Sequence, residues 1–240
     1  MSSNLAATLY LISGVLFILA LRGLSSPETS RQGNFFGVTG MVLAIIVTFL
    51  YINISVSGLI FIICAMTIGG SIGAVIAYRI SMTAMPQLVA GFHSLVGLAA
   101  VLVALSVYYN PEAFELGTLN NIKTASLIEM SLGASIGAIT FTGSVVAFLK
   151  LQGLMSSAPI TFKGQHFINL LIGIGIISLI IYVTINQSSH IFWILIIISF
   201  LIGVLLIIPI GGADMPVVIS MLNSYSGWAA AGIGFTLENT

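Results

Sequence analysis

Charge is what this sequence has least of. Only 5% of its 240 residues are Asp, Glu, Lys or Arg, whereas a soluble domain usually carries about 25%. The six basic and six acidic residues cancel, so composition implies neither nucleic acid nor a strongly charged protein as a partner. A single cysteine, Cys64, excludes an internal disulfide. No Cys/His group has the spacing of a metal site, so no metal is expected.

Apolar residues dominate instead. They make up 58% of the chain, and the mean hydropathy is +1.19. Because so apolar a chain cannot cover a water-facing surface, lipid must be its main solvent, and we predict an all-α, polytopic transmembrane bundle over residues 1–240. A span needs about 20 residues, and the apolar runs predict eight spans: Leu5–Leu21, Phe35–Ile54, Gly58–Tyr78, Met85–Tyr108, Thr124–Leu149, Phe167–Ile185, Ile191–Ile210 and Pro216–Leu237.

The basic residues orient these eight spans. Each loop lies on the opposite side of the membrane from the loop before it. With eight spans, five of the six basic residues fall on one side. These five are Arg22, Arg31, Arg79, Lys150 and Lys163. Only Lys123 falls on the other side. Since cytoplasmic loops are enriched in Lys and Arg, the five mark the cytoplasmic face, and both ends of the chain are predicted to be non-cytoplasmic.

His93 is the most informative polar residue. It lies eight residues past Met85, which is roughly 12 Å into the bilayer at a rise of about 1.5 Å per residue. An ionisable side chain near the midplane is costly and indicates function, and an imidazole changes charge near neutral pH. His93 is therefore a candidate proton relay. The alternative is a neutral histidine that hydrogen-bonds to a neighbouring helix.

Other polar residues lie at membrane depth. Asn223 lies about as deep as His93, in the most polar span, and could either line a water path or bond to another helix. Glu129, near the outer end of the fifth span, is either an outer proton mouth or an interfacial partner of Lys123. The further candidates for a proton channel are Ser94, Ser135 and Ser224.

Two glycine-containing segments also draw attention. Asp214 lies in a short turn, Gly211–Pro216, where it suits the N-cap of the last helix and could also contact a cytoplasmic domain. The segment Gly69–Ala74 recurs as Gly133–Ala138. Both copies contain a small-xxx-small pattern that favours close helix packing. A duplication of the chain segment in parallel orientation would produce the same repeat.

Four segments carry a family resemblance: Met85–Ala100, Ile139–Phe148, Gly211–Val218 and Ser220–Ala229. They resemble the beta subunit of the proton-translocating NAD(P) transhydrogenases, and the similarity extends over essentially the whole chain. The resemblance implies hydride transfer from NADH to NADP+ between soluble domains, coupled to inward proton movement. It also implies a bacterial inner-membrane location, an alpha subunit that binds NAD(H), and a dimer of the complete unit.

The resemblance also suggests residue roles. It implies that His93 is the proton relay, Asn223 its polar companion, and Asp214 the loop carboxylate that communicates with the NADP(H)-binding domain. Arg79, on the same predicted face, is a second candidate for that communication. The family's beta subunit has nine spans and a C-terminal NADP(H)-binding domain. We therefore expect a truncated chain that binds no nucleotide and has no catalytic residue for hydride transfer.

Two other classes of protein are alternatives. A secondary transporter would hold its substrate at the midplane between discontinuous helices. A structural scaffold for partner subunits would need no midplane histidine. Few spans are broken by proline and few charges are buried, which argues against the transporter.

Overall fold

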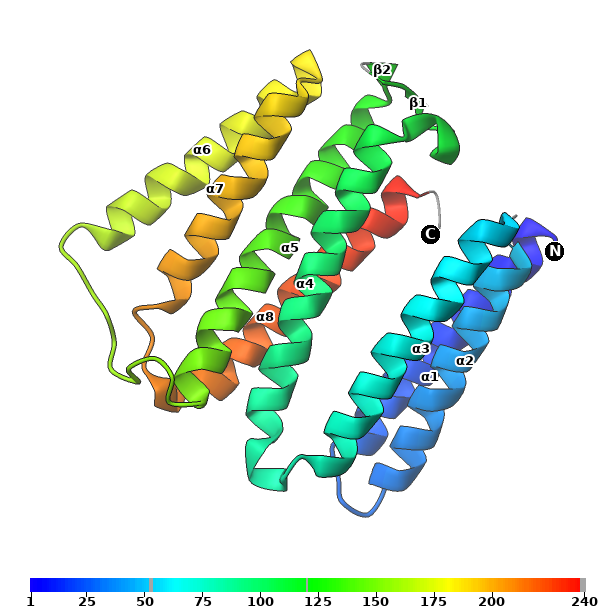
Figure 1. Ribbon diagram of the computed structural model, residues 1–240, viewed down its shortest axis with the longest axis horizontal. Coiled ribbons are helices and arrows are strands. Elements are labelled where there is room, and N and C mark those ends of the chain that lie inside the picture. The colour runs from blue at the N-terminus through cyan, green and yellow to red at the C-terminus, as the bar shows by residue number, and fades with distance from the viewer. Residues whose placement is uncertain (52–53, 120, 238–240) are drawn as a thin grey trace. The chain divides into compact units, whose positions relative to one another are not determined.

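The structure, a computed structural model, describes residues 1–51, 54–119 and 121–237. Eight α-helices run through this described part (Figure 1). They are α1 Ser3–Leu24, α2 Ser30–Tyr51, α3 Val56–Arg79, α4 Met85–Tyr109, α5 Thr124–Leu151, α6 Gln165–Asn186, α7 Ser189–Ile207 and α8 Met215–Thr236. The predicted all-α, polytopic bundle is confirmed.

The predicted spans agree with the helices to within a few residues at most ends. Seven helices are long and apolar enough to cross a membrane. The exception among the eight is α8, whose serines and Asn223 lower its hydropathy. Two predictions touch residues outside the described ranges: the second span was drawn through residues 52–53, and the truncated end was placed at residues 238–240.

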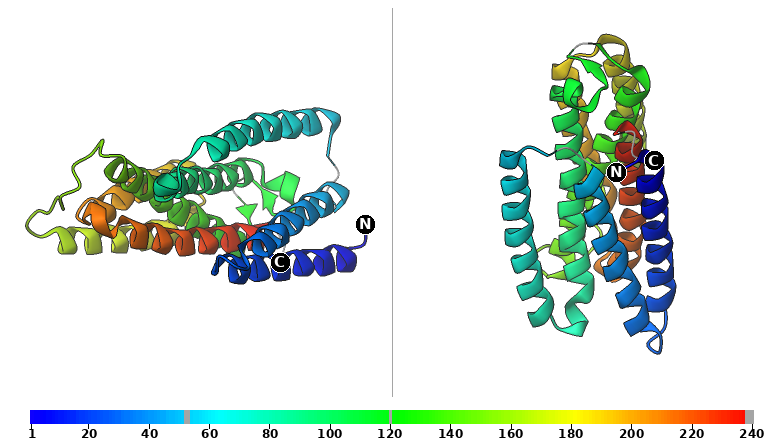
Figure 2. Two further views of the ribbon diagram at one scale, coloured as in Figure 1. Left: turned by 90° about the horizontal axis from the view of Figure 1, so that it is seen from below. Right: turned by 90° about the vertical axis from the view of Figure 1, so that its right-hand side faces the viewer.

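The chain divides into two compact units, residues 1–79 and residues 80–240, and each is described by itself. In the second unit α5 lies in the middle, packed against α4, α6, α7 and α8 (Figures 1 and 2). Small residues make this possible, since Gly133, Ala134, Gly137 and Ala138 are all buried in α5. A helix surrounded by helices must present small side chains on several faces, because each neighbour's backbone approaches closely.

The two ends of the second unit are built differently. At one end, a short hairpin of β1 (Gly117–Thr118) and β2 (Asn121–Ile122) follows a 3-10 turn, η2 (Pro111–Phe114). The Gln187 side chain accepts a hydrogen bond from Ile122 N at 2.8 Å and donates one to Ile122 O at 3.1 Å. The Tyr108 hydroxyl donates to Gln187 O at 2.7 Å, so this hairpin end is tied to both α4 and the turn before α7.

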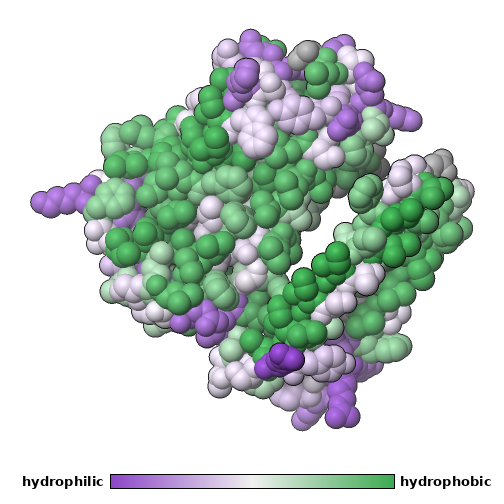
Figure 3. All heavy atoms as spheres, in the orientation of Figure 1, coloured by the Kyte–Doolittle hydropathy of each residue, from purple (hydrophilic) through white to green (hydrophobic). Residues whose placement is uncertain are grey.

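The opposite end, where Met85, Lys150 and Asp214 lie, has 3-10 turns η1 (Met82–Ala84) and η3 (Gly212–Asp214) before α4 and α8. We call it the Lys150 end. Between the two ends, hydrophobic residues cover the helix flanks, while hydrophilic ones gather toward the ends (Figure 3). Leu170, Ile177 and Ile197 are about 60% exposed (60%, 61% and 60%), as expected of side chains that face lipid.

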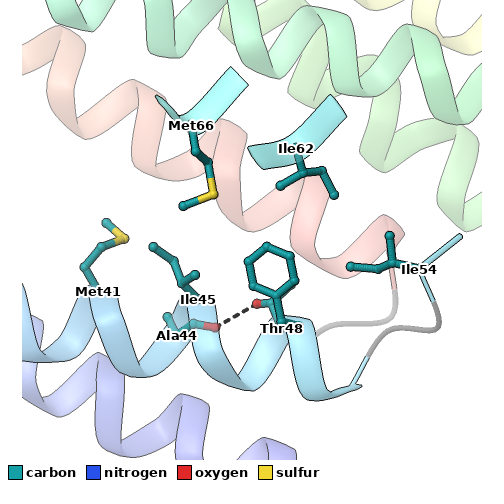
Figure 4. A pocket seen from close by; sticks show the side chains of 8 residues that line it. Met41, Ala44, Ile45, Thr48, Ile54, Ile62 and Met66 are labelled. Atoms are coloured by element: carbon teal, nitrogen blue, oxygen red, sulfur yellow. Dashed lines mark hydrogen bonds between the residues drawn. The ribbon is translucent and has the colours of Figure 1, made fainter. Parts of the chain in front are cut away.

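In the first unit, α1 and α2 form a tight antiparallel pair. The buried Ser13 hydroxyl donates to Gly40 O at 2.7 Å, and Tyr10 and Thr48 share a hydrogen bond of 2.9 Å. None of the residues of α3, all of which the structure describes, is buried. An apolar pocket lies between α2 and α3, where Met41 and Ile45 face Ile62 and Met66 (Figure 4). Because its lining is almost wholly apolar, the pocket offers no catalytic group.

Candidate functional site

The contact between α4 and α5 positions His93. The two helices approach so closely that a methyl group at Gly97 would lie 2.6 Å from Gly137 O and from Phe141 N. Further along, a methyl at Gly91 would lie 3.7 Å from the Phe148 ring. His93 is one helical turn from Gly97 and therefore shares the face that α4 presents to α5. It is buried, with 8% of its surface exposed.

Two hydroxyls lie on the side of α5 that meets α4, the helix of His93. Thr140 and Ser144 lie three and seven residues after Gly137, which places them on the α5 face that meets α4. The antiparallel register between the Gly97 and Gly91 contacts puts His93 level with Ser144, about one turn from Thr140. His93 Nε2, Thr140 Oγ1 and Ser144 Oγ are all buried and have no hydrogen-bond partner among the described residues.

We call this part of the α4–α5 contact, with His93, Thr140 and Ser144, the seam. Three unpaired polar atoms in one buried contact are unusual, because buried polar groups nearly always find a partner. Each unsatisfied atom costs about 1–3 kcal/mol. An imidazole and two hydroxyls can all accept hydrogen bonds, and the hydroxyls can also donate. The seam therefore has the chemistry to hold water in a short hydrogen-bonded chain beside His93.

Helix α8 brings Asn223 beside the first turns of α4, the helix of His93. Asn223 lines an open groove with Val89, which lies one turn before His93, and with Pro216 and Ser220. Its neighbour Leu222 is buried, and a methyl at Gly143 would lie 3.3 Å from the Leu222 side chain. The Asn223 side chain itself is exposed. The structure thus brings Asn223 within about a turn of His93, on the groove side of α8.

The other predicted channel residues are more dispersed. Ser94 is buried, but its hydroxyl donates to Gly91 O of its own helix at 2.7 Å. Ser224 is exposed and donates to Ser220 O at 3.4 Å. Ser135 is buried and has no hydrogen-bond partner within the described part of the chain. It shares a face with Thr142, which bonds to Phe200 O of α7 at 2.8 Å. Ser135 therefore lies away from the α4 face of α5.

Glu129 is half-buried in the part of α5 near the hairpin end. A methyl at Gly232 of α8 would lie 3.4 Å from the backbone carbonyl of Glu129, so this part of α5 lies beside the end of α8. Glu129 precedes Ser144 by fifteen residues on one helix, roughly 22 Å at 1.5 Å per residue. The structure does not bring it to His93.

Asp214 corrects one sequence prediction. It stands at the N-cap position of α8, but its side chain makes no capping hydrogen bond. A capping side chain needs extended backbone at this residue, and Asp214 instead ends the η3 turn with helical dihedrals, φ −90° and ψ −2°. Its carboxylate is exposed and so is open to a partner. Arg79 is also exposed, but it ends α3 in the other unit.

Lys150 corrects a second prediction. The charge pattern counted it among the cytoplasmic loop residues, but it lies within α5 and is only 2% exposed. Its ammonium group donates to Ile210 O at 2.6 Å, Ile208 O at 2.7 Å and Ala158 O at 3.4 Å. Lysine is rarely buried unless it is paired, and here three backbone carbonyls supply the pairing.

Comparisons with known proteins identify the family of this chain. The profile of the NAD(P) transhydrogenase beta subunit family matches residues 6–240. This chain belongs to that family. Two curated relatives, both named NAD(P) transhydrogenase subunit beta and both from Rhodospirillum rubrum, are each 56% identical over 239 residues. Those residues are 100% of this chain and 51% of each relative, so the chain spans about half the length of the curated relatives it matches.

Membership of the transhydrogenase beta family implies NAD(P)(H) in the full enzyme. The described residues do not fit such a cofactor. Their strands are the two-residue β1 and β2, whereas a dinucleotide site needs a longer strand that leads through a Gly-rich loop into a helix. Among the described residues, no three His, Cys, Asp or Glu side chains lie together as metal ligands.

Sequence reasoning did not select Thr140 and Ser144, although both lie in Ile139–Phe148, one of the segments that carried the family resemblance. A signal was present. The two hydroxyls are four residues apart, and Gly137 lies on the same helical face. Such a stripe permits a close helix contact that contains polar atoms, so it is a reasonable place to look for a partner of His93.

Proposed function

We propose that this chain forms a proton-conducting membrane domain of a transhydrogenase and that His93 is its proton relay. The observation that supports this most is that His93 Nε2, Thr140 Oγ1 and Ser144 Oγ are all buried without a hydrogen-bond partner among the described residues, on helix faces whose register puts His93 level with Ser144. A site of this kind can exchange a proton with a bound water. A merely structural histidine would instead be bonded to a neighbouring helix.

The remaining polar residues would line the paths by which protons reach His93. Asn223 and Ser220 line the open groove between α4 and α8, on the Lys150 side of His93. An amide cannot titrate, but it can orient water. Glu129, with Ser135 farther along α5, would collect protons from the hairpin end. Ser94 and Ser224 contribute least, since each hydroxyl bonds to a carbonyl of its own helix.

Coupling to hydride transfer would run through the Lys150 end. Hydride moves from NADH to NADP+ in soluble domains outside this bundle, so the membrane domain must sense the NADP(H)-binding domain by contact. The exposed Asp214, with Arg79 as a second candidate, would provide that contact. If protonation of His93 favours one docking state, docking must by linkage favour protonation to the same degree.

The assembly that this proposal requires is larger than the chain. It comprises an alpha subunit with an NAD(H)-binding domain, an NADP(H)-binding domain, and a second copy of the whole unit, in a bacterial inner membrane. Five of the six basic residues would lie toward the cytoplasm, and Lys123 and the N-terminus on the opposite side. The rival transporter is less well supported, because all eight helices of the described part run without an internal break.

The test is proton uptake by sealed vesicles that contain the assembled enzyme during hydride transfer. His93→Ala is expected to lower proton movement about a hundredfold, the lower end of what a positioned acid–base group contributes. His166→Ala is the matched control, because His166 is exposed at the start of α6. Unchanged proton movement in His93→Ala would overturn the relay assignment.

A further inference from the structure

The Lys150 ammonium joins three segments of the second unit. Lys150 belongs to α5, Ala158 to the loop of residues 152–164, and Ile208 and Ile210 to the turn that follows α7. An ammonium group has three N–H donors and no acceptor, and the three carbonyls match that number. Carbonyls at the end of a helix carry partial negative charge, so the end of α7 is a favourable place for a buried cation.

The loop of residues 152–164 and the turn that follows α7 also bond to each other. Gly212 N donates to Ser157 O at 2.9 Å, and Ile160 N donates to Ile208 O at 3.3 Å. The approach is close, because a methyl at Gly212 would lie 2.8 Å from the Ser157 Cβ atom. Loop 152–164 and the turn of residues 208–214 therefore form one docked assembly, with Lys150 beneath it and Asp214 at its end.

Helix α5 links this assembly to the histidine seam. Ser144, level with His93, precedes Lys150 by six residues of continuous helix, roughly 9 Å at 1.5 Å per residue. A packed helix transmits a displacement as a rigid element. Any shift of α5 that follows a change at the seam must therefore move the ammonium group and the carbonyls that bind it.

We propose that Lys150 is a positioning residue that transmits the state of α5 to the Asp214 turn. The inference rests on the function proposed above, because it gives Asp214 a coupling role. Lys150 touches neither proton nor nucleotide in this scheme. It fixes the position of the turn relative to α5, so that the seam and the exposed carboxylate move together.

The experiment is a graded series in the assembled enzyme in sealed vesicles: Lys150→Arg keeps a charged donor, Lys150→Gln a neutral one and Lys150→Met none. The measurement is the number of protons moved per hydride transferred. We expect this ratio to fall in that order, by about fivefold in Lys150→Met, the lower end of typical coupling between sites. Exchange of the Gly212 amide hydrogen should accelerate in the same order. Lys163→Met is the matched control, since Lys163 is exposed in the same loop.

A merely structural role would reduce the amount of assembled enzyme and leave the ratio unchanged. Equal ratios in all the variants that assemble would thus overturn the inference, as would a falling ratio without faster Gly212 exchange. If Lys150→Met does not assemble, the Arg and Gln variants still give the comparison. Failure of the underlying function is distinguishable, because the unsubstituted enzyme would then move no protons during hydride transfer.

Discussion

Two helices of this protein contain nearly the same six residues, but only one of them packs closely through those residues. Gly69–Ala74 lies in α3 and Gly133–Ala138 in α5. A methyl group at Gly69 or Gly73 would meet no atom of the described chain within 4 Å. At Gly133 it would lie 2.9 Å from Ile233, and at Gly137 it would lie 2.8 Å from Gly97 O.

The difference teaches that a small-xxx-small pattern permits close packing but does not produce it. In α5 the glycines meet α4 and α8, whose own small residues complete the contact. In α3 the same pattern lies on a helix with no buried residue. The difference arises from the neighbouring helices, because a close contact gains dispersion energy only where atoms lie on both sides of it.

The largest expected effect comes from filling the α4–α5 contact. Gly137→Leu would force its side chain against Gly97 O and the Ala100 methyl, which lies 2.9 Å from the site of the new carbon. We expect destabilisation by about 3 kcal/mol, the upper part of the range for overpacked cores. Thermal unfolding in detergent measures it.

The control for this variant is Gly73→Leu in α3. It should leave the unfolding midpoint of the isolated chain almost unchanged, since the side chain enters open space. Equal losses in the two variants would contradict the comparison and show that α3 has a packed glycine face after all.

A smaller effect is expected where α5 meets α7. A methyl group in Gly203→Ala would collide with Thr142 Oγ1 and lie 2.6 Å from Ile139 O. Because these atoms belong to α5, α7 must move away, and we expect a loss of about 2 kcal/mol. Gly175→Ala in α6 meets nothing within 4 Å and should be neutral or slightly stabilising in the same unfolding assay. Equal stability of the two variants would mean that α7 does not depend on this contact.

The smallest expected effect concerns one hydrogen bond. Thr142→Val removes the bond to Phe200 O across α5 and α7, and interhelical bonds in membranes contribute about 0.6 kcal/mol on average. Thr67→Val in α3 removes only a bond to Ile63 O of the same helix and should cost less. A double-mutant comparison with Gly203→Ala should be non-additive, because both changes act on one contact. Additive losses of stability would show that the Thr142 hydrogen bond and the close approach at Gly203 act independently.

Most of the fold could be predicted, because an apolar run of span length has few alternatives in lipid. The helix α4 begins at Met85 and α5 at Thr124, as predicted from the breakers before them. Less of the site could be predicted. His93 was selected for its predicted depth, but its neighbours depend on which helix faces it. Ser135 and Ser144 lie nine residues apart on one helix and face opposite sides, and local sequence does not reveal which side meets α4.

Sequence alone determined the membrane class and the helices and predicted the depth of His93, because hydropathy and a fixed rise per residue are local properties. Only the tertiary structure decided what each polar group meets. It put Thr140 and Ser144 on the α5 face that meets α4, the helix of His93. It showed that Lys150 is buried and bonded to three carbonyls rather than exposed in a loop, and that the Asp214 side chain makes no capping bond. Those outcomes depend on atoms from distant segments, which no local pattern contains.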